Sequence, residues 1–355
     1  MISTSHQLII GDAKNLDKIP NESVDLVVTS PPYPMIEMWD EIFAFQNPQI
    51  KTLLADNEGS MAFELMHREL DRAWDEVRRV LRRGGIACIN IGDATRTING
   101  LFQLYTNHSR VLQYFTQKGF VVLPCIIWRK QTNAPNKFMG SGMLPPGAYV
   151  TLEHEYILIL RKGERREFKT PREKQIRQKS AFFWEERNVW FSDIWKDLKG
   201  ASQRLSNNKI RRRSAAYPFE LAHRLINMFS VKGDTVLDPF LGTGTTMLAA
   251  MCNERNSIGV EIDSNFEEVV TRQFGDIVNF SNEIVSGRLK AHLGFVEKRI
   301  DSGKEVKYKN KHYGFPVVTR QETGLRLNLL DSIQNSGNRN YIVFYKETSP
   351  HSVLY

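Results

Sequence analysis

The chain contains 355 residues, which is enough for one large domain or two modest ones. Hydrophobic residues make up 41% of it and charged residues 25%, a balance typical of globular proteins that excludes wholesale disorder, collagen-like repeats and a long coiled coil. The formal net charge is +8, and the excess is concentrated between residues 161 and 213, where 17 basic residues stand against 7 acidic ones.

We expect no export signal at the beginning of this sequence, because a basic stretch followed by a long apolar one is missing there. The longest apolar run, Val121–Trp128, is interrupted by Pro124 and is far too short to span a membrane. Three cysteines, at positions 88, 125 and 252, are too few for a disulfide framework and form no zinc-binding pair. We therefore expect a cytoplasmic protein with no metal site and no membrane partner.

The first half of the chain alternates apolar runs with helical patterns, which is typical of an α/β unit. We predict strands at residues 24–29, 86–91, 120–128 and 155–160, and helices at 64–83 and 107–118. The first strand runs into Pro31 and Pro32, which cannot continue a ladder of hydrogen bonds. Residues 133–149 are rich in Gly, Pro and Asn, so we expect a long loop there.

The second half follows the basic segment and returns to the same alternation. We predict a helix at residues 218–229, a strand at 235–237, a helix from 246 to 252 and a strand at 257–261. Beyond Asp276 the chain is more polar, and alternating stretches at 314–318, 325–330 and 341–345 predict a small β-rich appendage.

A glycine-rich turn, residues 238–246 (Asp-Pro-Phe-Leu-Gly-Thr-Gly-Thr-Thr), lies between a predicted strand and a predicted helix. Its glycines allow a ligand to approach the backbone closely, and the helix start offers free N–H donors. Glu261, at the end of the next strand, is placed to accept hydrogen bonds from ribose hydroxyls. A dinucleotide fingerprint would need a third small residue where this chain has Met247. A nucleoside without pyrophosphate fits better, and S-adenosylmethionine is the obvious candidate.

A second motif, Ser30-Pro31-Pro32-Tyr33, directly follows the strand at residues 24–29. Residues just beyond the carboxyl ends of parallel strands line the ligand crevice of an open sheet. The prolines stiffen this SPPY loop (residues 30–33), so that the Ser30 hydroxyl and the Pro31 carbonyl are held as acceptors beside the flat face of Tyr33. These features describe a pocket for a planar base with an exocyclic amine.

Together the two motifs resemble those of the DNA amino-methyltransferases, which methylate an exocyclic amine of cytosine or adenine with S-adenosylmethionine. Because the SPPY loop precedes the glycine turn, the order is similar to that of the permuted beta group. Further segments that resemble this family are residues 11–13, 79–85, 90–93, 154–158 and 217–221, so the likeness extends over most of residues 7–270. Ser30 at the first position of the catalytic tetrapeptide resembles the cytosine-N4 branch, whereas enzymes that act on adenine more often carry Asp or Asn.

The resemblance implies a Rossmann-like α/β methyltransferase core with a mostly parallel, permuted seven-stranded sheet. It implies catalytic roles for Ser30, Pro31, Pro32 and Tyr33, and cofactor-binding roles for Asp12, Ala13, Phe219, Asp238, Pro239, Phe240, Gly242, Gly244, Thr245 and Glu261. It divides the chain into a catalytic half (1–160), a basic target-recognition segment (161–213), an S-adenosylmethionine-binding half (214–275) and an appendage (276–355). The implied partners are duplex DNA and a restriction endonuclease that acts on the same site.

Several alternatives remain at this stage. They are an adenine-N6 methyltransferase of the same group, a DNA-binding specificity subunit without catalysis, and an enzyme that methylates RNA or a protein amide. Cys125 follows a proline, as the nucleophile of cytosine-C5 methyltransferases does, but its apolar strand indicates core packing. The basic segment interleaves charges with Phe182, Phe183, Trp184, Trp190, Phe191 and Trp195, which favours a nucleic-acid footprint with aromatic rings that stack on bases.

Overall fold

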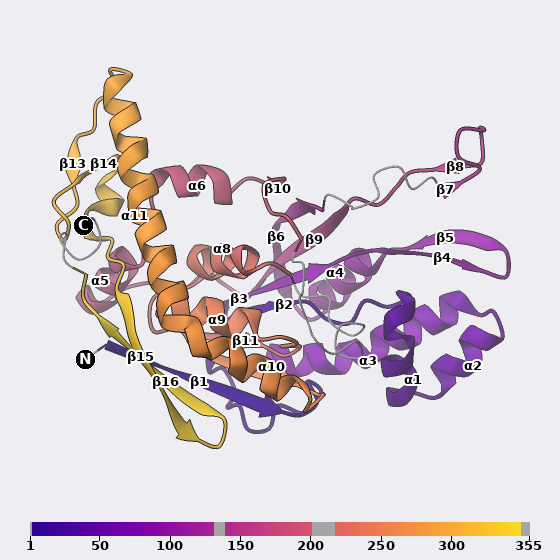
Figure 1. Ribbon diagram of the computed structural model, residues 1–355. Helices are drawn as coiled ribbons and strands as arrows, with labels where there is room; N and C mark the ends of the chain where they lie inside the picture. Colours follow the sequence, from indigo (N-terminus) through magenta and orange to yellow (C-terminus); the bar gives the residue numbers. More distant parts are fainter. Residues whose placement is uncertain (1, 131–138, 201–216, 349–355) are drawn as a thin grey trace.

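The computed structural model describes residues 2–130, 139–200 and 217–348, which build a ten-stranded sheet with helices on both faces (Figure 1). The strand order is β10 (Ile194–Trp195), β6 (Phe120–Arg129), β9 (His154–Lys162), β3 (Leu81–Ile91), β2 (Val24–Thr29), β11 (Thr235–Asp238), β12 (Asn256–Glu261), β1 (Ile2–Ile10), β16 (Asn340–Lys346) and β15 (Leu329–Gly337). The five strands from β3 to β1 are mutually parallel. The predicted mostly parallel α/β core is therefore confirmed.

The remaining described elements cover the sheet or project from it. The helices are α1 (Asp40–Gln46), α2 (Gln49–Ala55), α3 (Gly59–Val80), α4 (Asn107–Gln117), α5 (Pro171–Lys179), α6 (Trp184–Trp190), α8 (Phe219–Phe229), α9 (Thr245–Cys252), α10 (Phe266–Gln273) and α11 (Ile277–Asp301), with short 3-10 turns η1 (Glu37–Trp39), η2 (Phe274–Asp276) and η3 (Arg320–Gly324). Small hairpins are formed by β4 (Ala94–Ile98) with β5 (Leu101–Tyr105), β7 (Met139–Gly140) with β8 (Ala148–Tyr149), and β13 (Tyr308–Lys309) with β14 (Pro316–Val317). Among these described helices, none combines the length and the hydrophobicity needed to cross a lipid bilayer.

Alternating side chains of the central strands build two separate cores, one on each face of the sheet. In β2, Val27 packs into the core beneath α3 and α4, whereas Leu26 and Val28 pack into the core beneath α8 and α9. All six residues of β2 are buried, which a strand covered on both faces requires. This burial holds the carboxyl end of β2 rigidly beside those of its neighbours β3 and β11.

The boundaries of α3 and β3 differ from the prediction. The helix α3 runs from Gly59 to Val80 instead of from residue 64 to residue 83, and β3 already begins at Leu81 instead of at residue 86. Gly84 lies inside this strand with φ +78°, where a Cβ would approach the backbone nitrogen of Arg166 to 2.9 Å, so this glycine permits close chain contact. Of the predicted 133–149 loop, residues 133–138 lie outside the described residues, and the rest includes the β7–β8 hairpin.

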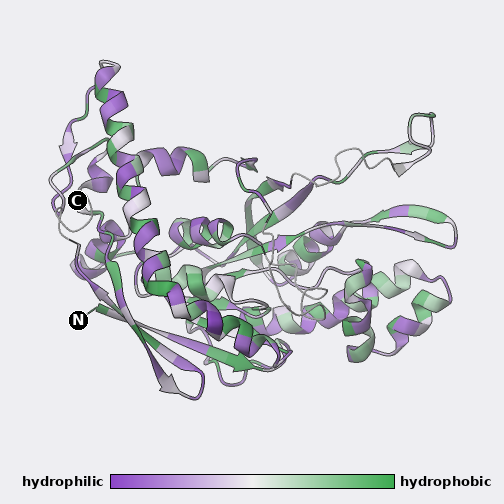
Figure 2. Cartoon of the chain, in the orientation of Figure 1, coloured by the Kyte–Doolittle hydropathy of each residue, from purple (hydrophilic) through white to green (hydrophobic). Residues whose placement is uncertain are grey.

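Of the predicted appendage, only the last two described strands belong to the central sheet, whereas α11, β14 and the residues around η3 form a hydrophobic cluster of their own. β16 pairs antiparallel with β1, and β15 follows it, so that with β10 at the opposite edge the described sheet has ten strands instead of the expected seven. The long helix α11 was not predicted. Its buried residues are Ile277, Ser281, Val285, Leu289, His292 and Val296, a stripe three or four residues apart in which Ser and His interrupt the apolar signal. Figure 2 shows hydrophobic and hydrophilic residues alternating along this helix.

The basic segment is also more closely integrated than expected. It begins inside β9 and continues through α5, α6 and β10, whereas residues 201–213 lie outside the described residues. The aromatic side chains predicted to stack on bases are mostly internal: Phe183, Trp190 and Trp195 are buried, and Trp184 stacks on Phe295 of α11. These rings fasten the segment to the core because their burial removes a large apolar area from water.

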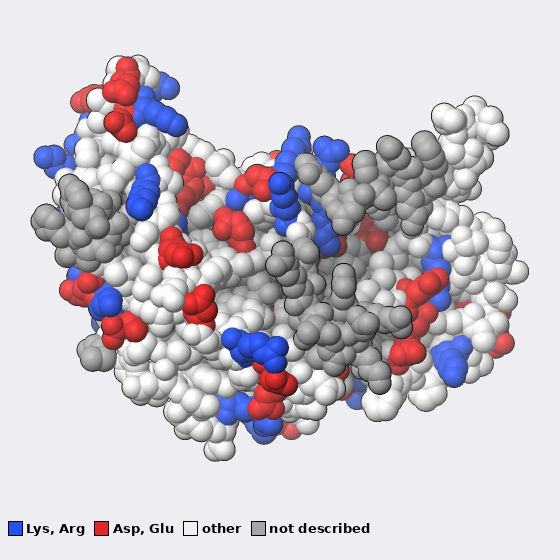
Figure 3. All heavy atoms as spheres, viewed as in Figure 1, with Lys and Arg blue, Asp and Glu red and all other residues white. Residues whose placement is uncertain are grey.

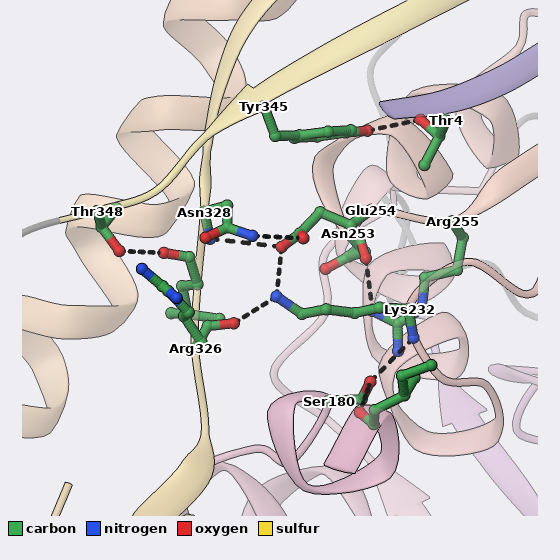
Figure 4. A network of polar contacts seen from close by, with 12 residues as sticks. Thr4, Ser180, Lys232, Asn253, Glu254, Arg255, Arg326, Asn328, Tyr345 and Thr348 are labelled. Atoms are coloured by element: carbon green, nitrogen blue, oxygen red, sulfur yellow. Dashed lines mark hydrogen bonds and ion pairs between the residues drawn. The ribbon is translucent and has the colours of Figure 1, made fainter. Parts of the chain in front are cut away.

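A buried polar network joins the segment, the core and the C-terminal strands (Figure 4). The Lys232 ammonium contacts the Glu254 carboxylate and the backbone carbonyl of Arg326, and the Lys232 N–H donates to Ser180 Oγ at 2.9 Å. Asn328 Nδ2 donates to Glu254 at 2.7 Å. Burial lowers the pKa of Lys232, with Glu254 opposing the shift. Three segments far apart in sequence are therefore held in one arrangement.

Candidate active site

A cavity of about 580 Å³ lies at the carboxyl ends of the parallel strands β2, β11, β12 and β1. The predicted site residues that line it are Asp12, Ala13, Ser30, Pro31, Pro32, Tyr33, Asp238, Pro239, Phe240, Gly242, Thr245 and Glu261. Two motifs about two hundred residues apart in sequence thus face the same space. This position corresponds to the crevice where open α/β sheets bind ligands.

Gly242 and Gly244 have different structural roles in the glycine turn. Gly242 lines the cavity with φ +55°, and a Cβ there would meet no atom within 4 Å, so its backbone is open to a ligand. Gly244 does not line the cavity. Its φ is +90° and a Cβ would come within 3.0 Å of Val270, so this glycine allows α9 to start close against α10.

Glu261 supports the glycine turn and also faces the cavity. Its two carboxylate oxygens accept hydrogen bonds from the backbone N–H of Gly242 at 2.8 Å and from that of Asp263 at 2.9 Å. Burial raises the pKa of this carboxyl, and the two N–H donors oppose the shift. A carboxylate has further lone pairs available, so Glu261 is able to accept additional hydrogen bonds from a ligand.

Asp238 connects the two motifs through its carboxylate. It accepts hydrogen bonds from the hydroxyls of Thr29 at 2.6 Å, Thr246 at 2.6 Å and Tyr217 at 3.1 Å. Thr29 ends β2 and Asp238 ends β11, so the contact locks the two loops together. Burial raises the pKa of Asp238, and these donors oppose that effect. Tyr217, which also lines the cavity, was not among the predicted site residues.

The Tyr33 hydroxyl is surrounded by three polar side chains from separate elements. Ser30 Oγ lies 2.9 Å away, Asn90 Nδ2 donates to it at 2.8 Å, and the hydroxyl donates to Glu155 Oε2 at 3.0 Å. Asn90 is in β3 and Glu155 in β9, and both are buried. The pKa of Tyr33 is raised well above its ordinary value by burial and by the Glu155 charge. Sequence analysis placed both residues in core strands without assigning them to the site.

Another buried amide holds the chain that leaves the SPPY loop. Asn107 Nδ2 donates to the carbonyl oxygens of Pro34 at 3.1 Å and Gly92 at 3.0 Å, while its Oδ1 lies 2.9 Å from His67 Nε2. Backbone carbonyls buried without a donor would be costly, so this clamp stabilises the loop in one conformation.

An apolar wall that sequence analysis did not identify completes the cavity. Trp39, Ile42 and Phe45 on η1 and α1 line it, and the Phe45 side chain is 85% exposed. The sequence signal that could have identified this wall is the spacing of these three apolar residues, which recur every three positions shortly after the SPPY loop. α1 is anchored from the other side, because Phe43 is buried in the core and Arg96 forms a bidentate ion pair with Asp40.

The charge of the cavity is one-sided. Among the described residues that line it, five are carboxylates (Asp12, Glu41, Asp238, Glu261 and Asp263) and none is Lys or Arg. Such a lining favours a ligand that carries positive charge.

Two residues weighed from the sequence lie elsewhere. Phe219, assigned to the cofactor, does not line the cavity; its ring packs edge-on against Phe280 of α11. Cys125 is half-buried, packs against the core and likewise does not line the cavity, in agreement with the packing interpretation.

One group of potential metal ligands occurs among the described residues, away from the cavity lining: Glu185, His292 and Glu322. These side chains already form hydrogen bonds with one another and with the backbone. His292 lies 2.8 Å from Glu185 and 3.0 Å from the Pro316 carbonyl, and Glu322 accepts the backbone N–H of Trp184 at 2.9 Å. This cluster therefore joins α6 to α11.

Comparison with known proteins agrees with this geometry. Residues 24–272 match the sequence model of the DNA methylase family N6_N4_Mtase. The chain is 51% identical over 350 residues to the Type II methyltransferase M.MthZI of Methanothermobacter thermautotrophicus, covering 98% of this chain and 97% of that protein. It is 53% identical over 285 residues to the Type II methyltransferase M.MjaI of Methanocaldococcus jannaschii, covering 77% and 92%. Among solved structures, a putative DNA modification methylase of Thermus thermophilus, complexed with S-adenosyl-L-methionine, is similar with 34% identity and a TM-score of 0.60, covering 77% of this chain and 96% of that one. The chain therefore belongs to the N6/N4 DNA methylase family.

Proposed function

We propose that this protein is an S-adenosylmethionine-dependent DNA methyltransferase that forms N4-methylcytosine on a base flipped out of duplex DNA. The observation that carries the proposal is the single cavity lined by both the SPPY loop and the glycine turn. Family membership and the two Type II relatives support methyl transfer to DNA. The bound S-adenosyl-L-methionine of the Thermus protein supports the methyl donor.

The charge and the lining residues of the cavity suit this donor. S-adenosylmethionine supplies an activated methyl group on a cationic sulfonium, which suits a lining with five carboxylates. Glu261 would hold the ribose hydroxyls, and Asp12 and Ala13, at the end of β1, would border the adenine. The open backbone at Gly242 and the start of α9 would face the methionine end.

The SPPY loop would receive and activate the target base. A base inside a duplex is out of reach, so it must be flipped at a cost of a few kcal/mol, which stacking on the Tyr33 ring offsets in part. Ser30 Oγ and the Pro31 carbonyl would accept hydrogen bonds from the exocyclic amine, which localises the nitrogen lone pair. Alignment of this nitrogen with the methyl group would remove much of the entropic barrier.

The choice of base and the biological partners belong to the same proposal. Ser30 at the first position supports cytosine-N4 over the runner-up, adenine-N6. We assign target recognition to the basic segment 161–213, with duplex DNA as the substrate. The Type II relatives support a role in a restriction-modification system with a cognate endonuclease.

Mass spectrometry of nucleosides tests the proposal directly. Plasmid DNA from a host without modification enzymes is incubated with the protein and isotope-labelled S-adenosylmethionine, then digested to nucleosides. We expect labelled N4-methylcytosine, and N6-methyladenine alone would replace the cytosine assignment with the runner-up.

Tyr33→Ala should abolish methylation while DNA binding is largely retained. A wild-type chain that binds DNA without transferring label would indicate a specificity subunit instead.

A further inference from the structure

Glu155 is a buried carboxylate whose two oxygens point to different partners. Oε1 contacts the Lys130 ammonium, and Oε2 accepts hydrogen bonds from Asn90 Nδ2 at 2.7 Å and from the Tyr33 hydroxyl at 3.0 Å. The proposed chemistry assigns no role to this residue, which is 9% exposed and comes from the antiparallel strand β9. Burying a charge costs free energy, so the presence of the Glu155 carboxylate beside the SPPY loop requires an explanation.

The direction of each hydrogen bond around Tyr33 follows from a count of hydrogens. Asn90 must turn its NH₂ toward Glu155, because two acceptors would repel at 2.7 Å, and the same NH₂ donates to the Tyr33 oxygen at 2.8 Å. Tyr33 has a single hydroxyl hydrogen, and the carboxylate of Glu155 is the strongest acceptor within reach. Ser30 Oγ, 2.9 Å from the Tyr33 oxygen, must therefore be the donor of their shared bond.

This direction determines what Ser30 presents to the cavity. A serine hydroxyl rotates freely and offers either its hydrogen or its lone pairs. With the hydrogen committed to Tyr33, the cavity side of Ser30 carries lone pairs alone, which is what an amine donor needs.

We propose that Glu155 is a positioning residue that, through the Tyr33 hydroxyl, holds Ser30 as a hydrogen-bond acceptor for the amine of the target base. This inference rests on the proposed function. It makes the serine equivalent to an aspartate, whose carboxylate presents acceptor oxygens in any orientation.

The variant Glu155→Gln removes the carboxylate that fixes the direction of these hydrogen bonds, with little change in shape. Lys130 selects the carbonyl oxygen of the new glutamine, so its NH₂ faces both Asn90 and Tyr33. The Asn90 amide must then turn its oxygen toward this NH₂, because two donors would repel at 2.7 Å. The Tyr33 hydrogen is shared between Asn90 Oδ1 and Ser30 Oγ, so the Ser30 hydroxyl is no longer held in one orientation. We expect kcat for methyl transfer to fall at least threefold, with KM for DNA and Kd for S-adenosylmethionine within twofold of wild type.

The matched control is Glu153→Gln, the same substitution two residues earlier. Glu153 pairs with Arg129 at 2.9 Å at the surface, and its contacts do not include Tyr33, so its kcat should stay within twofold of wild type. In a Ser30→Asp background, where the carboxylate presents acceptors alone in any orientation, Glu155→Gln should lower kcat less than twofold. In a Ser30→Ala background, Glu155→Gln should lower kcat by a further factor of less than two, because Glu155 acts through Ser30.

Two results would overturn the inference while leaving the proposed function intact. One is that the wild-type protein is active and Glu155→Gln retains full kcat, or lowers kcat as much in the Ser30→Asp and Ser30→Ala backgrounds as in the wild-type background. The other is a neutron structure from crystals grown in D₂O that shows the Ser30 deuterium pointing into the cavity instead of toward the Tyr33 oxygen. A wild-type chain that transfers no methyl group to DNA would overturn the proposed function and this inference with it.

Discussion

At the scale of single residues, His67 shows how the core supports the SPPY loop. Its Nε2 lies 2.9 Å from Asn107 Oδ1, and Asn107 in turn donates both amide hydrogens to backbone carbonyls, so Oδ1 is an acceptor and Nε2 carries the proton. Nδ1 is buried without a partner among the described residues. Burial, reinforced by the Arg110 charge, lowers the pKa of His67 from 6.5 to about 3, which keeps the ring neutral.

This histidine predicts a loss of stability in acid. Between pH 6.5 and about 3 the unfolded chain binds a proton that the folded chain excludes, so the free energy of unfolding falls as pH decreases. The slope for one such group is about 1.4 kcal/mol per pH unit. His67→Gln, which keeps a donor for Asn107, should flatten the dependence by about that amount in urea unfolding at pH 6, 5 and 4, where the unfolded histidine is mostly protonated. An unchanged slope would contradict the assignment of a neutral ring.

At the scale of elements, α1 contributes the apolar wall beside the SPPY loop. Successive turns link them, since Ile36 N–H donates to the Tyr33 carbonyl and Trp39 N–H to that of Ile36. The Arg96–Asp40 pair ties α1 to β4, which follows β3, and β3 lies on the side of β2 that is away from β12. The wall thus belongs to the half of the cavity that would receive the target base.

Phe45→Ala tests this wall. Stacking against a base contributes about 1–3 kcal/mol, so methyl transfer at saturating cofactor should fall about tenfold. Thermal stability should be unchanged because the ring is 85% exposed. Met38→Ala is the control, since Met38 lies in η1, directly before α1, and does not line the cavity. A weaker Kd for S-adenosylmethionine with an unchanged rate would place the wall against the cofactor instead.

The contact between α6 and α11 fixes the described part of the basic segment to the core. Arg288 forms a bidentate ion pair with Glu186 at 2.6 and 2.8 Å, and both side chains are largely buried. Arg288→Met leaves the Glu186 charge buried and unpaired, so we expect a loss of about 3–5 kcal/mol in chemical denaturation. The control Arg272→Met breaks an exposed pair with Glu268 and should cost less than about 1 kcal/mol. Equal losses would argue against this anchoring role.

At the scale of the whole molecule, charge and shape are organised around one hollow face. Figure 3 shows a hollow between the end of α11 and the β7–β8 hairpin, with Lys and Arg side chains gathered over β6 and β10 at its centre. Residues outside 161–213 hold 31 basic and 33 acidic side chains, so the positive excess comes from that segment alone. A duplex held over this face would bring its phosphates to the basic segment.

The salt dependence of DNA binding measures that contribution. Each phosphate contact changes the slope of log K against log salt by about −0.9, so several contacts should give a slope more negative than about −3. Fluorescence anisotropy with a labelled duplex between low and moderate salt provides the measurement. A flat response would show that the basic segment does not bind the DNA backbone.

Local patterns in the sequence were sufficient for much of the fold, and together with the family resemblance they were sufficient for most of the candidate site. The β2 strand, the SPPY loop and the glycine turn can each be predicted from fewer than ten consecutive residues, because proline, glycine and apolar residues mark them. Twelve of the fourteen predicted site residues line the cavity. Phe219 and Gly244 do not, because both are needed for packing against α11 and α10.

Other features were decided by tertiary structure. Tyr33 meets Asn90 and Glu155 across 57 and 122 residues, and no local pattern encodes such a contact. Apolar periodicity also does not tell which partner buries a residue, so aromatic side chains of the basic segment that suggested stacking on DNA bases pack inside the protein. Short-range steric effects and local hydrogen bonds depend on neighbouring residues. The meeting of side chains that are distant in sequence depends instead on the order of the strands in the sheet. The sequence alone therefore determined the chemistry that the two loops offer, and the fold determined which buried groups direct it.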